Sequence, residues 1–248
     1  MEIKEFLNLK NPPKNIFYKG NLSLLDKRKI AIIGSRNMSV YTKNCIISLA
    51  SLLKKVDVCV VSGGAIGVDI NASIYAMPNT IAIFANGLDN IYPKSNFKYI
   101  KQIYENALAL SENENNYVPK KYDFLLRNRL IIALSEAVVI AQADLQSGSM
   151  QSAKLALKMN KPIYVLPQRA QESDGTNFLL ANKQANLIYN FEEFVMKFGN
   201  LNKEKDEFLE FCKRGVSLQE ALNLYKDKVY EYELDGKIQI DGIFIRVV

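Results

Sequence analysis

The chain has no histidine among its 248 residues, and this absence excludes several kinds of active site. Without an imidazole the protein cannot form a Ser-His-Asp triad or a Cys-His pair, and it cannot bind a metal ion through histidine. An enzyme with this sequence would have to work with carboxylates, amines or backbone groups. We predict no catalytic residues, no metal site and no cofactor.

Cysteine is also scarce, because Cys45, Cys59 and Cys212 are odd in number and far apart. A disulfide framework needs pairs, and a structural zinc site usually needs four closely spaced ligands. The three thiols are therefore expected in the core of a protein from a reducing compartment. No stretch approaches the roughly 18 apolar residues of a membrane span, and the first ten residues lack the apolar region of a signal peptide. We expect a soluble, cytoplasmic protein with no membrane partner.

The composition that remains is that of a globular protein, with 48% hydrophobic and 23% charged residues. At about 150 residues per domain, the length allows one large domain and one small one. Lys and Arg number 32 against 26 Asp and Glu, which leaves a net charge of +6. This excess favours an anionic partner without identifying it.

Short apolar runs alternate with helical patterns along the middle of the chain. The six predicted strands are Ile30–Ile33, Val58–Val61, Ile81–Phe84, Ala107–Leu110, Ala137–Ala141 and Ile163–Leu166. Continuous apolar runs are typical of strands buried on both faces, so residues 29–198 are predicted to form a doubly wound α/β fold with a mostly parallel sheet. Residues 1–28 contain Pro12, Pro13 and Gly20, and are expected to form an irregular lead-in with at most one helix, packed on the sheet edge.

The end of the chain predicts a second, smaller domain. Residues 199–206 are polar and typical of a linker. Over residues 207–248 we predict three short helices, 207–212, 217–224 and 228–234, and then a hairpin that turns at Asp241-Gly242, with Ile238 and Ile240 opposite Ile245 and Ile243. This order is that of a winged-helix domain, although an oligomerisation or docking module has the same pattern.

Three loops that follow predicted strands are rich in glycine and serine and precede helices. They are Gly34-Ser35-Arg36, the loop that begins Ser62-Gly63-Gly64, and the loop that ends Ser147-Gly148-Ser149. In an open parallel sheet such loops meet at one edge, where their N–H groups can bind phosphate. A row of such sites suits a polymer better than a mononucleotide. The alternative is that the glycines only form tight turns, and the loop around Asp89 is predicted to be structural.

Residues 120–134 predict a helix with an apolar stripe of Leu126, Leu130, Ala133 and Leu134. Its other side is expected to present Phe124, Arg127 and Asn128, with Lys121 just upstream. An aromatic ring beside cations is typical of single-strand binding, because bases stack on the ring while the cations contact phosphates. In the alternative, Phe124 is in the core and the arginines pair with Asp123 or Glu136. Arg129 is expected to point away from Arg127 and to be structural.

Taken together, these motifs resemble those of the DprA (Smf) family, DNA-processing proteins of natural transformation. The resemblance rests on Gly34-Ser35-Arg36, the segment Ser62 to Asp69, Gly87-Leu88-Asp89 with Tyr92-Pro93, Phe124-x-x-Arg127-Asn128-Arg129-x-Ile131, Leu134-Ser135, Ser147-Gly148-Ser149 and Gly175-x-Asn177-x-Leu179. It implies an extended Rossmann fold, a homodimer formed through it, and a positively charged pocket that binds single-stranded DNA. It also implies that the protein protects incoming DNA and loads RecA onto it.

Carried over by position, the resemblance implies roles for individual residues. The residues expected to bind DNA are Gly34, Ser35, Arg36, Ser62, Gly63, Gly64, Phe124, Arg127, Asn128, Ser147, Gly148 and Ser149, to which we add Lys121 for its charge. Phe124 would stack on a base. The last forty residues resemble the family's optional winged-helix end, a possible contact for other competence proteins.

The sequence departs from the family pattern in three places. Gln142 stands where a Glu is often found, and Leu166-Pro167-Gln168 replaces a common Val-Pro-Gly. The sterile-alpha-like domain of many members would need more residues than precede Ile30. Two other functions stay open: a nucleotide-processing enzyme of the phosphoribohydrolase type, which would need a carboxylate base, and a nucleotide-sensing adaptor.

Overall fold

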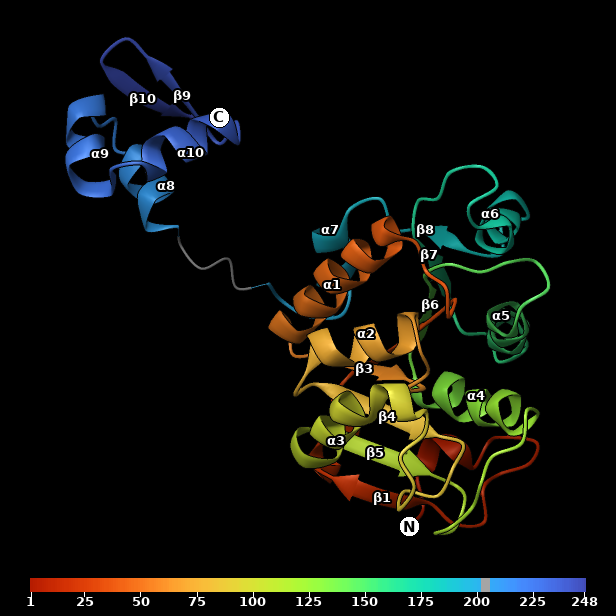
Figure 1. Ribbon diagram of the computed structural model, residues 1–248. Coiled ribbons are helices and arrows are strands. Elements are labelled where there is room, and N and C mark those ends of the chain that lie inside the picture. The colour runs from red at the N-terminus through yellow and green to blue at the C-terminus, as the bar shows by residue number, and fades with distance from the viewer. Residues whose placement is uncertain (202–205) are drawn as a thin grey trace. The chain divides into compact units, whose positions relative to one another are not determined.

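Figure 1 presents the computed structural model, which describes residues 1–201 and 206–248. The chain divides into two compact units, Met1–Leu201 and Asn202–Val248. Half of the predicted linker, residues 202–205, lies outside the described residues. Within the described ranges, no helix combines the length and the apolar character needed to cross a membrane.

The larger unit is built on one eight-stranded sheet, in the order β1-β5-β4-β3-β2-β6-β7-β8. Its strands are β1 (Phe17–Gly20), β2 (Lys29–Ile33), β3 (Cys59–Ser62), β4 (Thr80–Phe84), β5 (Leu108–Ser111), β6 (Ala137–Ile140), β7 (Ile163–Val165) and β8 (Asn186–Leu187). All neighbours are parallel except β1, which is antiparallel to β5. The predicted doubly wound, mostly parallel sheet is confirmed, and its six predicted strands are β2 to β7.

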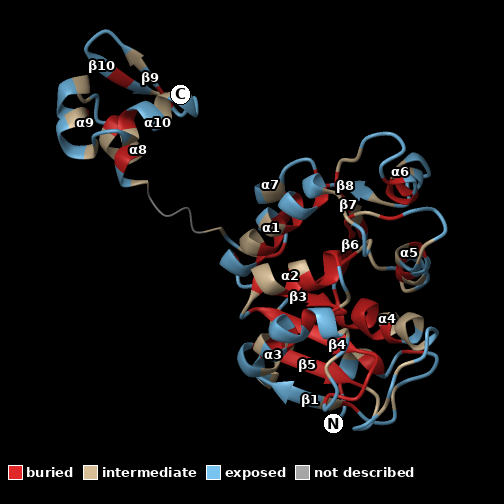
Figure 2. Ribbon diagram, viewed as in Figure 1, coloured by how far each residue is buried: buried red, intermediate tan, exposed pale blue. Residues whose placement is uncertain are grey.

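Helices cover both faces of this sheet. They are η1 (Lys4–Phe6), η2 (Leu22–Asp26), η3 (Lys94–Asn96), α1 (Val40–Lys55), α2 (Val68–Ala76), α3 (Phe97–Asn106), α4 (Asp123–Leu134), α5 (Gly148–Lys158), α6 (Asp174–Ala181) and α7 (Phe191–Met196). Side chains alternate across β2: Ile30 and Ile32 join the core under α1, α2 and α7, whereas Ala31 and Ile33 join the core under α4 and α5. Both faces of the central strands are therefore buried, as Figure 2 shows in red.

The first 28 residues differ from the predicted irregular lead-in. They contain β1 and two short 3-10 helices, and Phe6 of η1 is buried in the core that also contains α4 residues. Strand β1 extends the sheet beyond β5. It ends at Gly20, where φ is +99° and a β-carbon would lie 2.0 Å from the carbonyl oxygen of Ala107. Only glycine permits this approach, so the segment is tied to the sheet edge by its backbone.

The sheet has its topological switch point at β2, which pairs with β3 on one side and with β6 on the other. In open α/β sheets the crevice outside the carboxyl ends of the strands at such a point is where ligands bind. The loops that follow β2, β3 and β6 all end at this crevice.

The smaller unit has a core of its own. Its elements are α8 (Glu207–Cys212), α9 (Leu218–Tyr225), α10 (Lys228–Leu234), β9 (Ile238–Asp241) and β10 (Phe244–Val247). Ser217 and Glu220 form a capping box at the start of α9, and Ser217 also bridges Phe244 of β10. Phe208, Val229 and Ile245 are among the buried residues that hold these elements together. Three helices followed by a hairpin are in winged-helix order.

The predicted register of this hairpin is wrong. Ile240 lies opposite Ile245 and Ile238 opposite Val247, while Ile243 is in the turn and 70% exposed. The two residues of the turn are Gly242 and Ile243, because Asp241 pairs with Phe244. Gly242, in the first central position, has a φ of +62°. A two-residue turn with glycine in that position matches the twist of the flanking strands.

The three cysteines are buried and unpaired, as the sequence predicted. Burial raises the pKa of the Cys59 thiol to about 12, so this thiol stays protonated at neutral pH. The cysteines therefore act as small core residues.

Candidate functional site

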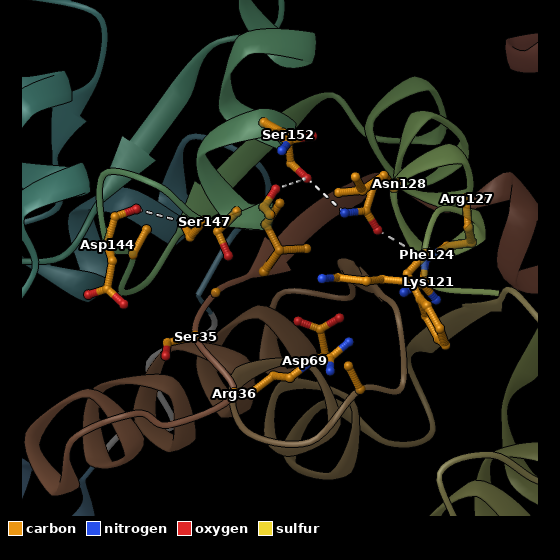
Figure 3. A pocket seen from close by; sticks show the side chains of 18 of the residues that line it. Ser35, Arg36, Asp69, Lys121, Phe124, Arg127, Asn128, Asp144, Ser147 and Ser152 are labelled. Atoms are coloured by element: carbon orange, nitrogen blue, oxygen red, sulfur yellow. Dashed lines mark hydrogen bonds between the residues drawn. The ribbon is translucent and has the colours of Figure 1, made fainter. Parts of the chain in front are cut away.

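A large cavity, which we call the main pocket, lies at the switch point and has a volume of about 770 Å³. It is lined by Ile33, Gly34, Ser35, Arg36, Ala65, Asp69, Tyr92, Pro119, Lys121, Phe124, Leu125, Arg127, Asn128, Ala143, Asp144, Gln146, Ser147, Gly148, Ser149, Gln151 and Ser152. Figure 3 shows Asp144 and Ser147 on one side of it and Lys121 and Phe124 on the other. Ten of the thirteen predicted site residues line this cavity.

The loop after β2 brings Arg36 to the pocket. The amide of Ser35 donates to the carbonyl of Gln142, 2.9 Å away, and the carbonyl of Ser35 accepts from the amide of Val68 at 3.1 Å. Gly67 allows this packing, because a β-carbon there would lie 2.4 Å from the Ser35 carbonyl oxygen. The loop is thus held between two neighbouring loops while the Arg36 side chain remains exposed.

Two aromatic rings and Arg36 meet on one side of the pocket. Phe124 is half-buried at the start of α4, and its ring centroid lies 5.8 Å from that of Tyr92. The Arg36 guanidinium carbon lies 5.7 Å from the Phe124 centroid. In the described part of the chain, Arg36 makes no ion pair within 4.0 Å. The pocket therefore has a partly open ring beside a cation that no ion pair holds.

Tyr92 was missed as a site residue, since its loop was predicted to be structural. The signal available was an aromatic residue in a loop that follows a parallel strand, here β4. Asp89 of the same loop is structural: its carboxylate accepts from the amide of Asn116 at 2.8 Å. One loop therefore supplies both a ring for the pocket and its own anchor.

The sequence predicted that Arg127 projects from the exposed side of the helix, and this prediction is wrong. Arg127 is 4% exposed and donates to the carbonyl oxygens of Gly63, at 2.7 Å, and Ile83. Its position explains the difference, because Arg127 stands three, four and seven residues before Leu130, Ile131 and Leu134, on the buried stripe of α4. Leu126, predicted in that stripe, is 40% exposed instead.

Asp69 is the acidic partner of this buried guanidinium. Its carboxylate accepts from the amide of Gly63 at 3.2 Å. Burial raises the pKa of Asp69 to about 6 and lowers the pKa of Arg127 to about 10, and each charge opposes the shift of the other. Gly63 lies between them, since a β-carbon there would be 2.5 Å from both Arg127 Nη2 and Asp69 Oδ2. The pair fixes the floor of the main pocket.

Ser62-Gly63-Gly64, the last residue of β3 and the first two of the loop after it, were predicted to bind phosphate, and the structure places them in this floor. Ser62 is buried and donates to the carbonyl of Ile32 at 2.7 Å. Gly64 packs on the Phe84 ring and its carbonyl accepts from Asn96 at 3.1 Å. Gly63 reaches only a small adjoining cavity of about 50 Å³. The Ser62 hydroxyl, the Gly63 amide and the Gly64 carbonyl are bonded within the protein, and none of the three residues lines the main pocket.

Helix α5 begins at the opposite side of the pocket. The Ser147 hydroxyl accepts from the amide of Met150 at 3.3 Å and donates to the carbonyl of Asp144 at 2.7 Å, so it caps the helix. Gly148, the first residue of α5, lines the pocket. The start of α5 carries partial positive charge, which favours an anion there.

Asn128 and Lys121 complete the lining in different ways. Asn128 accepts from Arg127 Nε at 3.0 Å and donates to the Ser152 hydroxyl at 2.8 Å, so it joins α4 to α5. Lys121 is exposed and lines the pocket. Of the alternative partners predicted for the arginines, Glu136 pairs with Arg28 at 2.6 Å and Asp123 accepts from Tyr117 at 2.7 Å.

The charges of the pocket favour an anionic ligand. Three cations line the pocket, the exposed Arg36 and Lys121 and the buried Arg127. Two carboxylates line it as well, those of Asp69 and Asp144. Over residues 1–201 and 206–248 no cluster of three Cys, Asp or Glu residues could hold a metal ion. The arrangement suits a ligand with both a flat ring and phosphate groups.

Comparison with known proteins gives consistent matches over the larger unit. The family described as DNA recombination-mediator protein A matches residues 3–199. DNA processing protein DprA of Bacillus subtilis is 36% identical over 161 residues, which cover 63% of this chain and 54% of that protein. The chain thus matches about half the length of this relative.

Two solved structures are similar in both sequence and fold. DNA processing protein A from Helicobacter pylori is 51% identical with a TM-score of 0.78, covering 79% of this chain and 93% of that chain; that structure is described for its single-stranded DNA binding mode. DprA from Streptococcus pneumoniae is 31% identical with a TM-score of 0.74, covering 79% of this chain and 71% of that one. The family match over residues 3–199 spans every loop of the main pocket.

Proposed function

This chain belongs to the DNA recombination-mediator protein A family, the DprA or Smf family of its motifs, and on that premise we propose that it binds single-stranded DNA in the main pocket. The observation that carries the proposal is the partly open Phe124 ring beside the unpaired Arg36 guanidinium. A base that stacks on this ring places its phosphates within reach of the cations. Its 51% identity to the H. pylori protein, which is described for single-stranded DNA binding, supports the same ligand.

Different groups of the pocket bind the bases and the phosphates of the strand. Phe124 and Tyr92 offer aromatic faces to bases, a contact worth about 1–3 kcal/mol per base and tolerant of any sequence. Arg36 and Lys121 contact phosphates through charge, and the amides at the start of α5 bind them through hydrogen bonds. Asp69 and Arg127 do not contact DNA in this proposal. They hold the loops in position.

We further propose that the protein is a recombination mediator and not an enzyme. A phosphoribohydrolase needs an accessible carboxylate base. Of the two carboxylates that line the pocket, Asp69 is buried and bonded to the Gly63 amide, which leaves the exposed Asp144 as the one such an enzyme could use. The proposed role is to protect incoming strands during natural transformation and to load RecA onto them. A homodimer formed through the larger unit, and contacts with other competence proteins through the smaller one, complete this proposal.

Fluorescence anisotropy with three ligands tests the proposed binding. A labelled oligothymidylate should bind more tightly than a duplex of the same length, and mononucleotides should not compete with it. If a nucleoside monophosphate competes at equal affinity, the adaptor function replaces the proposal. If incubation with nucleoside monophosphates releases free base, the enzyme function replaces it.

Separate assays test the partners. Strand exchange by RecA on DNA coated with a single-strand-binding protein should be stimulated by this protein, and light scattering should give twice the monomer mass of 28.1 kDa. Unchanged strand exchange would contradict the mediator role, and a monomer mass at micromolar concentration would contradict the dimer.

A further inference from the structure

A second groove lies between α4 and α5 and adjoins the main pocket. Its volume is about 320 Å³, and it is lined by Tyr122, Leu125, Leu126, Arg129, Gln151, Ser152, Lys154, Leu155 and Lys158. We call it the α4–α5 groove. Leu125, Gln151 and Ser152 line both cavities, so the groove begins where the pocket ends.

The groove has positive charge that is only partly neutralised by neighbouring carboxylates. Its lining contains three cations and no Asp or Glu. Arg129 pairs with Glu112 at 2.6 Å, as the sequence prediction of a structural role implies. Lys154 and Lys158 are exposed and, among the described residues, make no ion pair within 4.0 Å. Two cations of α5 are therefore free for a ligand.

The groove also has an exposed aromatic ring. Tyr122 immediately precedes α4 and is 65% exposed. It follows Lys121 and lies two residues before Phe124, both of which line the main pocket. Leu126, 40% exposed on the next turn, extends the apolar surface. The groove thus repeats the combination of ring and free cations that the pocket presents.

We infer that the α4–α5 groove is a second subsite for the DNA strand, which continues into it from the main pocket. Lys154 and Lys158 contact successive phosphates, and the ring of Tyr122 stacks on a base. The two lysines are one helical turn apart, about 6 Å along the axis of α5, so a single extended strand can reach both. The inference rests on the proposed function, because it places the occupant by continuity with the main pocket and by complementary charge.

A series of oligothymidylates of increasing length tests the inference on the full chain. The variant Lys154→Gln/Lys158→Gln should match the wild type for the shortest oligomers that bind and lose most of the affinity that the wild type gains with length. For long oligomers, its salt slope should be lower by about 1.4, at about 0.7 per phosphate contact. The matched control is Lys54→Gln/Lys55→Gln on α1, which removes the same charge from the other face of the sheet.

The outcomes separate this inference from the function on which it rests. If the groove variant and the wild type give the same affinity at every length, the groove is not a strand subsite and the inference is overturned. If the two double variants lose affinity equally, the effect is one of net charge and the inference is overturned as well. If the wild type fails to bind even the long oligomers, the proposed function itself fails.

A second variant pair tests the role of the ring. Tyr122→Ala should weaken binding of long oligomers by about 5- to 150-fold without changing the salt slope, because it removes stacking and no charge. Tyr122→Phe keeps the ring and should bind as the wild type does. Equal affinities of the alanine and phenylalanine variants, both folded by circular dichroism, would remove Tyr122 from the subsite.

Discussion

The residue that most changes the understanding of the site is Arg127, a guanidinium buried under a pocket for anions. Its contacts with the Gly63 and Ile83 carbonyls tie α4 to the ends of β3 and β4, and its charge is compensated by Asp69. A buried charge that loses its partner costs far more than an exposed one. In the proposed function, Arg127 supports DNA binding by fixing the floor of the main pocket.

Replacing Arg127 should lower the stability of the folded protein more than it lowers the affinity for DNA. Arg127→Met is expected to lower the free energy of unfolding by about 3–5 kcal/mol, because it leaves Asp69 buried without its cation. The double variant Asp69→Asn/Arg127→Met should recover part of that loss, which urea denaturation of the four proteins measures as a coupling. Losses that simply add, or a loss below about 1 kcal/mol, would contradict this assignment.

The raised pKa of Asp69 predicts that the stability of the fold decreases as the pH rises. Its pKa in the folded protein is about 6, above the usual 3.8, so the folded state binds the proton more tightly than the unfolded state does. Its contribution to stability is fully present below about pH 4 and is lost as pH rises through 6, by up to about 3 kcal/mol.

Comparison with Asp69→Asn isolates this contribution from that of other carboxylates. The wild type should lose stability relative to the variant between pH 4 and pH 7, as measured by urea denaturation at each pH. A difference between the two proteins that stays constant over this range would show that Asp69 keeps its ordinary pKa.

At the scale of elements, Ser147 at the start of α5 has two roles that can be tested separately, one in stability and one in ligand binding. Ser147 caps the helix, and the same helix end faces the main pocket. Ser147→Ala should lower the free energy of unfolding by about 1 kcal/mol through loss of the cap. Ser147→Asp keeps a capping oxygen and should keep stability, but its negative charge should repel phosphate and weaken DNA binding, most at low salt.

Denaturation and anisotropy measured on both variants distinguish these roles. If Ser147→Asp binds single-stranded DNA as tightly as the wild type at low salt, the start of α5 does not receive a phosphate.

The elements also show what a sequence pattern can and cannot predict. The six strands β2 to β7 were predictable because each is a continuous apolar run, whereas β8 has two residues and β1 is mostly exposed. The face of α4 was predicted wrongly at Leu126 and Arg127, since an arginine is assigned to solvent unless its buried partner is known. That partner, Asp69, lies on another helix, and sequence spacing carries no information about such a contact.

For the site, the sequence predicted which loops meet but not which of their groups face the cavity. Loops that follow neighbouring parallel strands meet at one edge, so Arg36 and Ser147 were placed together by topology. Phe124 lies on a helix, and it was assigned to the same pocket by the resemblance to the family. Which groups of a loop face the cavity depends on hydrogen bonds that form only in the fold. The Gly63 amide, bonded to Asp69 instead of facing a phosphate, is the example.

At the scale of the whole molecule, the charge is divided unevenly between the two units. Residues 202–248 carry 8 Lys and Arg against 10 Asp and Glu, which leaves 24 against 16 in residues 1–201. Nonspecific affinity for nucleic acid comes from positive charge, so we expect the larger unit to provide it. The α10 helix of the smaller unit, in the third position of a winged helix, carries Glu231 and Glu233.

Removal of the smaller unit should therefore leave binding of single strands intact. A chain ending at Leu201 keeps the whole main pocket and should bind oligothymidylate within about twofold of the full chain, with an unchanged salt slope. Anisotropy titrations of both proteins check this, with thermal unfolding as the control for folding. A tenfold loss of affinity in a folded truncated chain would assign part of the DNA site to the smaller unit.

The central claim is that one pocket binds single-stranded DNA through a ring and through cations that act independently. The most direct measurement is the salt dependence of oligothymidylate affinity for the wild type, Phe124→Ala and Arg36→Ala. We predict that Phe124→Ala lowers affinity by about 1–3 kcal/mol at every salt concentration without changing the slope, and that Arg36→Ala reduces the slope by about 0.7. Affinity that is independent of salt, or unaffected by the loss of the Phe124 ring, would contradict the account.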